Sequence, residues 1–177
     1  MIVHKTTIDG LVIIEPRVFE DSRGYFYESY NKKIFKELGI NIDFIQDNQS
    51  FSNKGTLRGL HFQKEPYAQD KLVRVIKGSV LDVAVDLRKE SPTYGKWESI
   101  ILSEDNKLMF LIPKGFAHGF ITLENNTIFQ YKCSNVYNKE SEDGIIWNDP
   151  DLNIDWGLIR PTNISEKDNV LSKFKKI

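Results

Sequence analysis

Residues able to do acid–base chemistry first appear together in the stretch 55–63. It contains His61, one of three histidines in the chain, with Arg58 three residues before it. Apolar residues fill the positions between, as in a half-buried β-strand. Histidine changes charge near neutral pH and arginine is a fixed cation, so the pair could move a proton beside an anionic ligand. A core strand with an incidental histidine fits the same residues.

The parity of this strand separates the two side chains. Residues an odd number apart on a regular strand point to opposite faces, so Arg58 and His61 would diverge. Both reach one cavity only if the strand kinks or bulges, and Gly59 is the residue where this can happen. A shared site therefore predicts a bulge at Gly59, whereas a straight strand would remove Arg58 from the site.

Other residues of similar chemical character are spread along the chain. His118 lies among glycines at 115–120, and Tyr131 and Tyr137 lie on or just after the run 127–132. Each candidate also has a purely structural interpretation, such as support of a helix start for Asp168, three residues after Ser165. The cationic candidates are Arg23, Arg58, Lys71 and Lys167, and the acidic candidates are Glu28, Asp82, Asp86, Glu142 and Asp168.

Metal and nucleophilic sites have little support in these spacings. Metal sites in barrels often place two histidines at i and i+2, but Gln63 stands two residues after His61. A site made of His61, His118 and a carboxylate remains geometrically possible. A P-loop, a Rossmann fingerprint, a nucleophile elbow and a paired-cysteine zinc site are absent. The single cysteine, Cys133, allows no internal disulfide and fits a reducing compartment.

The bulk composition indicates a soluble cytoplasmic protein. With 177 residues, 40% of them hydrophobic, residues 1–177 are expected to form one domain with a real core. No apolar run approaches the length of a membrane span, and residues 1–10 lack the apolar core of a signal peptide. The net charge of -1 argues against a nucleic-acid partner held by bulk electrostatics. Neither nucleic acid nor a membrane is an expected partner.

The elements that must position these residues are mostly strands. Short strands at intervals of about ten residues, separated by Gly, Pro and Asn turns, predict a β-sandwich or a closed barrel. The runs 71–76 and 80–87 flank Lys77-Gly78-Ser79, which is typical of a β-hairpin. The stretch 42–50 has period two and passes from apolar to amide residues, which predicts a strand running into a polar pocket. A further strand is expected at 25–30, and helices only at 32–38 and 166–174.

In order, these motifs resemble the dTDP-4-dehydrorhamnose 3,5-epimerases, cupin-type jelly-roll enzymes of nucleotide-sugar metabolism. The resemblance runs from residue 3 to about residue 168. The matching segments are DSRG at 21–24, QDN at 46–48, LRGLHFQ at 57–63, KLVRV at 71–75, DVAVDLR at 82–88, PKGFAHGF at 113–120, YK at 131–132 and WNDP at 147–150.

The resemblance implies an isomerase of dTDP-rhamnose biosynthesis that works without a metal or other cofactor. It would epimerise C3 and C5 of dTDP-4-dehydro-6-deoxy-D-glucose to give dTDP-4-dehydro-L-rhamnose. His61 is similar to the family's catalytic base, Asp168 to its dyad partner, and Tyr131 to the proton donor on the opposite face. Tyr137 is similar to the tyrosine that stacks on the nucleotide base. The other substrate-binding matches are Arg23, Glu28, Gln46, Asn48, Arg58, Lys71, His118, Glu142 and Lys167.

The resemblance also implies a homodimer. In this family Arg23 and Glu28 are contributed across the interface, so the site would be shared between subunits, with N-terminal strands exchanged. Three other functions stay open. They are a mono-epimerase or 3,4-ketoisomerase acting on a related nucleotide-linked 4-keto sugar, a non-catalytic sugar-nucleotide-binding jelly roll, and a metal-dependent dioxygenase. Tyr131 favours double epimerisation, because inversion demands a proton donor on the far face of the sugar.

Overall fold

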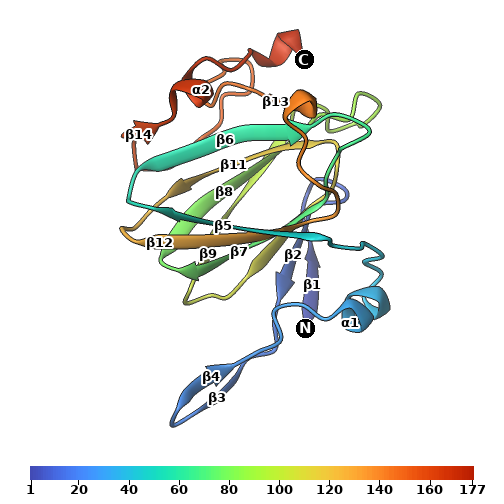
Figure 1. Ribbon diagram of the computed structural model, residues 1–177, viewed down its shortest axis with the longest axis vertical. Helices are drawn as coiled ribbons and strands as arrows, with labels where there is room; N and C mark the ends of the chain where they lie inside the picture. The colour runs from blue at the N-terminus through green and yellow to red at the C-terminus, as the bar shows by residue number, and fades with distance from the viewer.

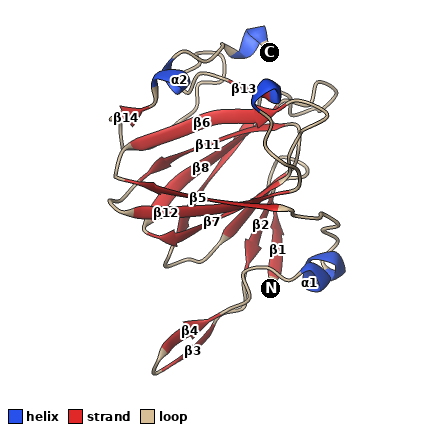
Figure 2. Ribbon diagram, in the orientation of Figure 1, coloured by secondary structure: helices blue, strands red, loops and turns tan.

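Two β-sheets face each other and enclose the interior of the protein, which a computed structural model describes over residues 1–177 (Figures 1 and 2). The first sheet has six strands in the order β1-β2-β10-β7-β12-β5, each antiparallel to its neighbours. These are β1 (Ile2–Lys5), β2 (Val12–Glu15), β10 (Met109–Ile112), β7 (Lys71–Lys77), β12 (Thr127–Cys133) and β5 (Gln46–Ser52).

The second sheet follows the order β13-β6-β11-β8-β9, with β14 beside β6 in the parallel direction. Its strands are β13 (Glu142–Gly144), β6 (Thr56–Gln63), β11 (Phe116–Thr122), β8 (Ser79–Asp86), β9 (Trp97–Ser103) and β14 (Asn163–Ile164). The helical segments are α1 (Lys32–Glu37), α2 (Glu166–Asn169) and the 3-10 turns Lys139–Ser141 and Phe174–Lys176. This arrangement confirms the predicted mainly β class with a few short helices. No helix has the length and apolar character needed to span a membrane.

Strand β8 shows how the sequence pattern separates the core from the site. Seven of its eight residues are buried, so both of its faces are covered. Val83 and Val85 pack outward, in an apolar cluster with the C-terminal segment that includes Trp156. Asp82 alternates with them, since successive side chains on a strand point to opposite faces. The alternation noted in the sequence therefore places a carboxylate on the face turned toward the interior between the sheets.

The turn at Gly78 does not form the predicted hairpin. Strands β7 and β8 belong to different sheets, and Gly78, with φ of +78°, carries the chain from one to the other. Its N–H donates to Glu104 Oε1 at 2.7 Å. Val75 and Val80, on either side of the turn, both pack in the central apolar cluster. The reversal was predicted correctly, but the pairing was wrong because the two apolar runs bury their side chains in the core between the sheets.

The predicted helix at 166–174 is also shorter than expected. Helix α2 begins after Ser165, whose Oγ accepts from the Asp168 N–H at 3.0 Å, and it ends at Asn169. Ser172 then forms a bridge with Ile145, beside the second sheet. The backbone there pairs with the body of the protein, and this stops the helix.

A two-stranded arm projects from the body (Figure 1). It consists of β3 (Phe19–Asp21) and β4 (Gly24–Phe26), so the strand expected at 25–30 is confined to its first residues. Phe19, Tyr25 and Phe26 are 51%, 55% and 67% exposed. Three large aromatic side chains on one short hairpin form an unusual apolar surface for an isolated chain.

Candidate active site

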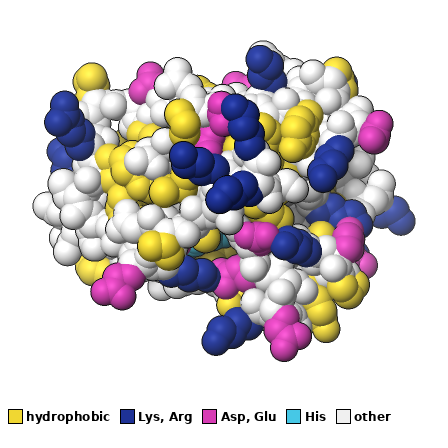
Figure 3. All heavy atoms as spheres, turned by 90° about the horizontal axis from the view of Figure 1, so that it is seen from above, with side chains coloured by type: hydrophobic (Ala, Val, Ile, Leu, Met, Phe, Trp, Pro, Cys, Tyr) yellow, Lys and Arg dark blue, Asp and Glu magenta, His cyan; other side chains and the backbone are white.

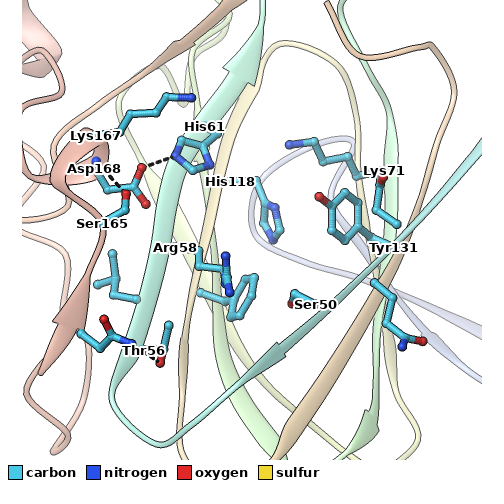
Figure 4. A pocket seen from close by; sticks show the side chains of 15 residues that line it. Ser50, Thr56, Arg58, His61, Lys71, His118, Tyr131, Ser165, Lys167 and Asp168 are labelled. Atoms are coloured by element: carbon cyan, nitrogen blue, oxygen red, sulfur yellow. Dashed lines mark hydrogen bonds and ion pairs between the residues drawn. The ribbon is translucent and has the colours of Figure 1, made fainter. Parts of the chain in front are cut away.

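A cavity of about 600 Å³ lies in the interior, with β6 and the α2 region on one side and β5, β7 and β12 on the other (Figure 4). Most of its lining side chains are polar or charged, which indicates a polar ligand. They are Asn48, Gln49, Ser50, Thr56, Leu57, Arg58, His61, Lys71, His118, Phe120, Tyr131, Asn163, Ser165, Lys167 and Asp168.

A bulge at Gly59 brings Arg58 and His61 to the same cavity, as predicted. The pairing of β6 with β11 is irregular here: His61 lies opposite His118, but Arg58 lies opposite Phe120. One extra residue thus stands on β6, and it reverses the parity of the strand. Gly59 has φ of +130°, and a Cβ there would lie 2.5 Å from Gly119 Cα, so only glycine fits. Both side chains line the cavity.

His61 and Asp168 form a close pair at the edge of the cavity. His61 Nε2 lies 2.7 Å from Asp168 Oδ1, and the Gly59 N–H donates to Asp168 Oδ2 at 3.2 Å. Burial raises the pKa of Asp168, but its bonds to His61 and Gly59 outweigh this effect, so the pKa lies below its usual value. An ionised Asp168 holds the Nε2–H of His61 and leaves Nδ1 free to accept a proton. The predicted pairing of these two residues is confirmed.

A second histidine–aspartate pair lies deeper. His118 Nε2 lies 3.0 and 2.9 Å from the two carboxylate oxygens of Asp82, which has no exposed side-chain surface. Burial lowers the pKa of His118; Asp82 opposes this, while the charge of Lys71 adds to it. His118 is therefore a neutral imidazole near pH 7 that donates its Nε2–H to Asp82.

Lys71 and Tyr131 line the side of the cavity across from His61 (Figure 4). Burial lowers the pKa of Lys71, against the opposing charges of Cys133, Asp82 and Glu142. Burial also raises the pKa of Tyr131. A protonated Lys71 and the phenol of Tyr131 are both able to donate a proton. The cavity thus has the His61 imidazole on one side and two groups able to donate on the other.

A smaller cavity of about 150 Å³ adjoins the first and shares His61, Lys71 and Tyr131 with it. Tyr137 is 53% exposed, and its hydroxyl donates to Glu142 Oε2 at 2.8 Å. Lys167 Nζ lies 2.5 Å from the same oxygen. Seen from above, histidine atoms are visible at one place on this face, with basic and acidic side chains close by (Figure 3). A flat aromatic ring beside charged groups suits a nucleotide at the entrance.

Most of the predicted site residues are therefore brought together. Eight line the main cavity: Asn48, Arg58, His61, Lys71, His118, Tyr131, Lys167 and Asp168. Gln46, Tyr137 and Glu142 line the smaller one. Arg23 and Glu28 do not reach either cavity. Arg23 lies on the projecting arm and pairs with Asp21, and Glu28 follows the arm and accepts from Asn31.

Sequence reasoning missed Ser50, Thr56 and Asn163, which also line the main cavity. The period-two pattern of β5 could have found Ser50, because it lies on the same face as Asn48. Asn163 belongs to the short strand β14, for which the sequence has no signal. No group of three or more His, Cys, Asp or Glu side chains gathers in an arrangement that could hold a metal ion.

Comparison with known proteins agrees with this site. The model of the dTDP-4-dehydrorhamnose 3,5-epimerase family matches residues 5–176. The chain belongs to this family. It is 54% identical over 166 residues to the dTDP-4-dehydrorhamnose 3,5-epimerase of Methanothermobacter thermautotrophicus, covering 93% of this chain and 89% of that protein. It is 52% identical over 172 residues to the Escherichia coli enzyme, covering 97% and 93%.

A solved structure extends the family match to the fold. The dTDP-6-deoxy-D-glucose-3,5-epimerase of Legionella pneumophila, in complex with dTDP-4-keto-L-rhamnose, superposes with a TM-score of 0.95 at 50% identity. The alignment covers 99% of this chain and 93% of that one. The predicted family, the cupin-type fold, the isomerase class and the 3,5-epimerase function are confirmed at this level.

Proposed function

We propose that this epimerase inverts C3 and C5 of dTDP-4-dehydro-6-deoxy-D-glucose by acid–base catalysis, with His61 as base and Tyr131 as acid. The observation that carries the proposal is the hydrogen-bonded His61–Asp168 pair across one cavity from Tyr131. The 4-keto group makes the C3 and C5 hydrogens acidic, because each carbanion delocalises into an enolate. A base that titrates near neutral pH is suited to remove them.

Inversion needs a proton from the other face of the sugar. His61 takes the hydrogen from carbon as a proton, and the electron pair moves into the enolate. Tyr131 then delivers its phenolic proton to the same carbon from the opposite side. His61 releases the proton it has taken to solvent, and a solvent proton restores the phenol, so both groups are ready for the second carbon. Lys71 donates to the enolate oxygen and neutralises its developing charge. The steps require no redox change, and Lys71 supplies the charge stabilisation of the enolate, so the proposal includes no metal or redox cofactor.

The nucleotide half would occupy the entrance. The bound dTDP-4-keto-L-rhamnose of the Legionella relative supports a dTDP-linked sugar as ligand. The ring of Tyr137 can stack on the nucleotide base. The amide side chains of Gln46 and Asn48, at the start of β5, line the same smaller cavity and can hydrogen-bond the nucleotide. The guanidinium of Arg58 suits the diphosphate, because its planar fork bonds phosphate oxygens in pairs.

We infer that the active protein is a homodimer whose arms complete the sites. In an isolated chain Arg23 is far from the cavity, on an arm with three exposed aromatic side chains. A second copy of the chain would cover these rings and receive Arg23 and Glu28 at its own cavity. We also infer that residues 1–177 form one domain. The enzyme would work in the cytoplasm, where nucleotide sugars are made and where a free thiol such as Cys133 stays reduced.

Turnover in D₂O tests the reaction. Incubation with dTDP-4-keto-6-deoxyglucose, followed by product NMR, should show solvent deuterium and inverted configuration at both C3 and C5. Replacing His61 with alanine should lower the rate by at least about 10²-fold. Label and inversion at one carbon only would identify a mono-epimerase, and a shifted carbonyl a ketoisomerase. Tight binding without any exchange would identify a binding protein.

Mixing two inactive variants tests the shared site. Neither Arg23→Ala nor His61→Ala should turn over substrate alone. After unfolding and refolding together, half of the dimers should be mixed, and each mixed dimer would have one intact site. Activity should therefore return to about a quarter of the wild-type value. No recovery, or a fully active monomer by size-exclusion chromatography, would refute the shared site.

A further inference from the structure

Ser50 carries a buried hydroxyl that has no hydrogen-bond partner in the protein. It is the sole buried side-chain nitrogen or oxygen in the chain without a hydrogen bond. Buried polar atoms are nearly always hydrogen-bonded, and leaving one unpaired lowers stability. All other buried side-chain nitrogens and oxygens of this protein have partners, so this exception points to a role outside folding.

The neighbours of Ser50 on the same strand face are already engaged. The face of β5 that turns inward carries Gln46, Asn48, Ser50 and Ser52 in succession. Gln46 donates to Asn48, which in turn donates to the sulfur of Cys133, and Ser52 accepts from Arg58. Ser50 alone in this row is free. Since its Oγ makes no hydrogen bond, turning toward a ligand would break none.

Its position lies where the sugar would meet the diphosphate. Ser50 lines the main cavity, between Arg58, proposed above to bind the diphosphate, and Tyr131, proposed to face the sugar, and it does not line the smaller cavity of Tyr137 (Figure 4). Arg58 is a donor only, as is a protonated Lys71, so neither can accept a hydrogen bond from a hydroxyl. A serine oxygen both donates and accepts, and a sugar hydroxyl does the same.

We propose that Ser50 hydrogen-bonds a ring hydroxyl of the substrate and so orients the hexose between His61 and Tyr131. This inference rests on the proposed function, because it takes the ligand to be a nucleotide-linked hexose. The bond forms only when sugar is present. Ser50 is therefore a substrate-binding residue. Removing its hydroxyl should weaken binding of the sugar and should lower neither the nucleotide affinity nor the stability of the free protein.

The test compares Ser50→Ala with the wild type, using dTDP and dTDP-glucose as ligands in isothermal titration calorimetry. The dTDP affinity should stay within about twofold, and the dTDP-glucose affinity should fall about three- to tenfold, as for one hydrogen bond. The thermal midpoint of the free variant should equal or exceed that of the wild type, because an unpaired group is removed. Ser99→Ala, on β9 and outside both cavities, is the matched control and should change none of these values.

Three outcomes would overturn the inference. Equal losses for dTDP and dTDP-glucose would move the contact to the nucleotide. Unchanged affinity for both would mean that water alone satisfies the hydroxyl. A lower thermal midpoint of the free variant would make the serine a folding residue. These measurements need no turnover, so a wild type that binds both ligands but does not epimerise would refute the proposed function and leave the sugar contact standing.

Discussion

In the proposed mechanism Asp168 orients His61 to act as the base, and the substitution Asp168→Asn isolates this contribution. Both oxygens of this carboxylate act as acceptors, one from His61 Nε2–H at 2.7 Å and the other from Gly59 N–H at 3.2 Å. Asparagine has one acceptor oxygen and one NH₂ donor in the same places. If its oxygen faces Gly59, its NH₂ faces Nε2 and forces the ring proton onto Nδ1, which blocks the base. If its oxygen faces His61, two donors oppose each other at Gly59.

The expected loss is large and confined to chemistry. Both arrangements also remove the negative charge that stabilises the imidazolium once His61 has taken the proton. A positioned acid–base group contributes about 10²–10⁴-fold in rate. We expect kcat/KM to fall by about 10³-fold, which corresponds to ~4 kcal/mol of transition-state stabilisation. The affinity for dTDP should change little, because the diphosphate and the thymine ring are expected to bind to residues other than Asp168.

Steady-state kinetics and calorimetry with dTDP measure the two quantities. Asp143→Asn is the control: its carboxylate, on β13 next to β6, bonds Lys64 and its neighbour's backbone but lines neither cavity. The control should keep kcat/KM within about twofold of the wild type, because this partly exposed pair lies outside both cavities. If Asp168→Asn retains more than about a tenth of the wild-type kcat/KM, the carboxylate does not set the tautomer of His61 and the reasoning fails.

Three further predictions follow from the same geometry. Tyr131→Phe should lower the yield of inverted product by about 10²-fold while deuterium exchange at the sugar, followed by NMR, falls less, because His61 can return a proton to the face it took it from; parallel losses would refute the role. Lys71→Met should lower kcat by about 10²–10³-fold with dTDP affinity nearly unchanged by calorimetry, since only the enolate needs the ammonium. Asp86 is fully buried, and although burial raises its pKa, bonds from Arg88, Ser91 and Thr93 hold that pKa well below its usual value. Its stabilisation is thus fully present above about pH 4 and falls progressively as the pH drops from there toward the lowered pKa of the folded protein, so Asp86→Asn should cost about 3 kcal/mol in urea unfolding at pH 7 and less at pH 3.

The sequence predicts best where a local rule has one physical solution. Arg58 and His61 can share a cavity only through a bulge, and glycine is the residue that permits one, so a shared site fixed the irregularity at Gly59 in advance. The polar face of β5 was likewise visible as period two. In both cases the information lies within a few residues and does not depend on the rest of the chain.

The sequence predicts poorly where the outcome depends on distant segments. Lys77-Gly78-Ser79 encodes a reversal, but whether the flanking strands pair or separate depends on the other strands available to each. Likewise, the residue pattern around Asp168 indicated only the start of a helix. Its pairing with His61, 107 positions away, came from the family resemblance, because no spacing rule connects residues so far apart.

The two histidine–aspartate pairs show why residue type does not assign the base. Their contacts are alike, 2.7 Å for His61–Asp168 and 2.9 Å for His118–Asp82. Their surroundings differ, since the side chain of His61 is 29% exposed and that of His118 is 7% exposed. Burial lowers the pKa of His118, and the charge of Lys71 lowers it further against the opposing effect of Asp82, so this ring is a neutral hydrogen-bonding group near pH 7. His61 lies at the edge of the cavity, within reach of solvent. The proposed mechanism therefore uses the outer pair, whose ring can exchange a proton with water, as the base.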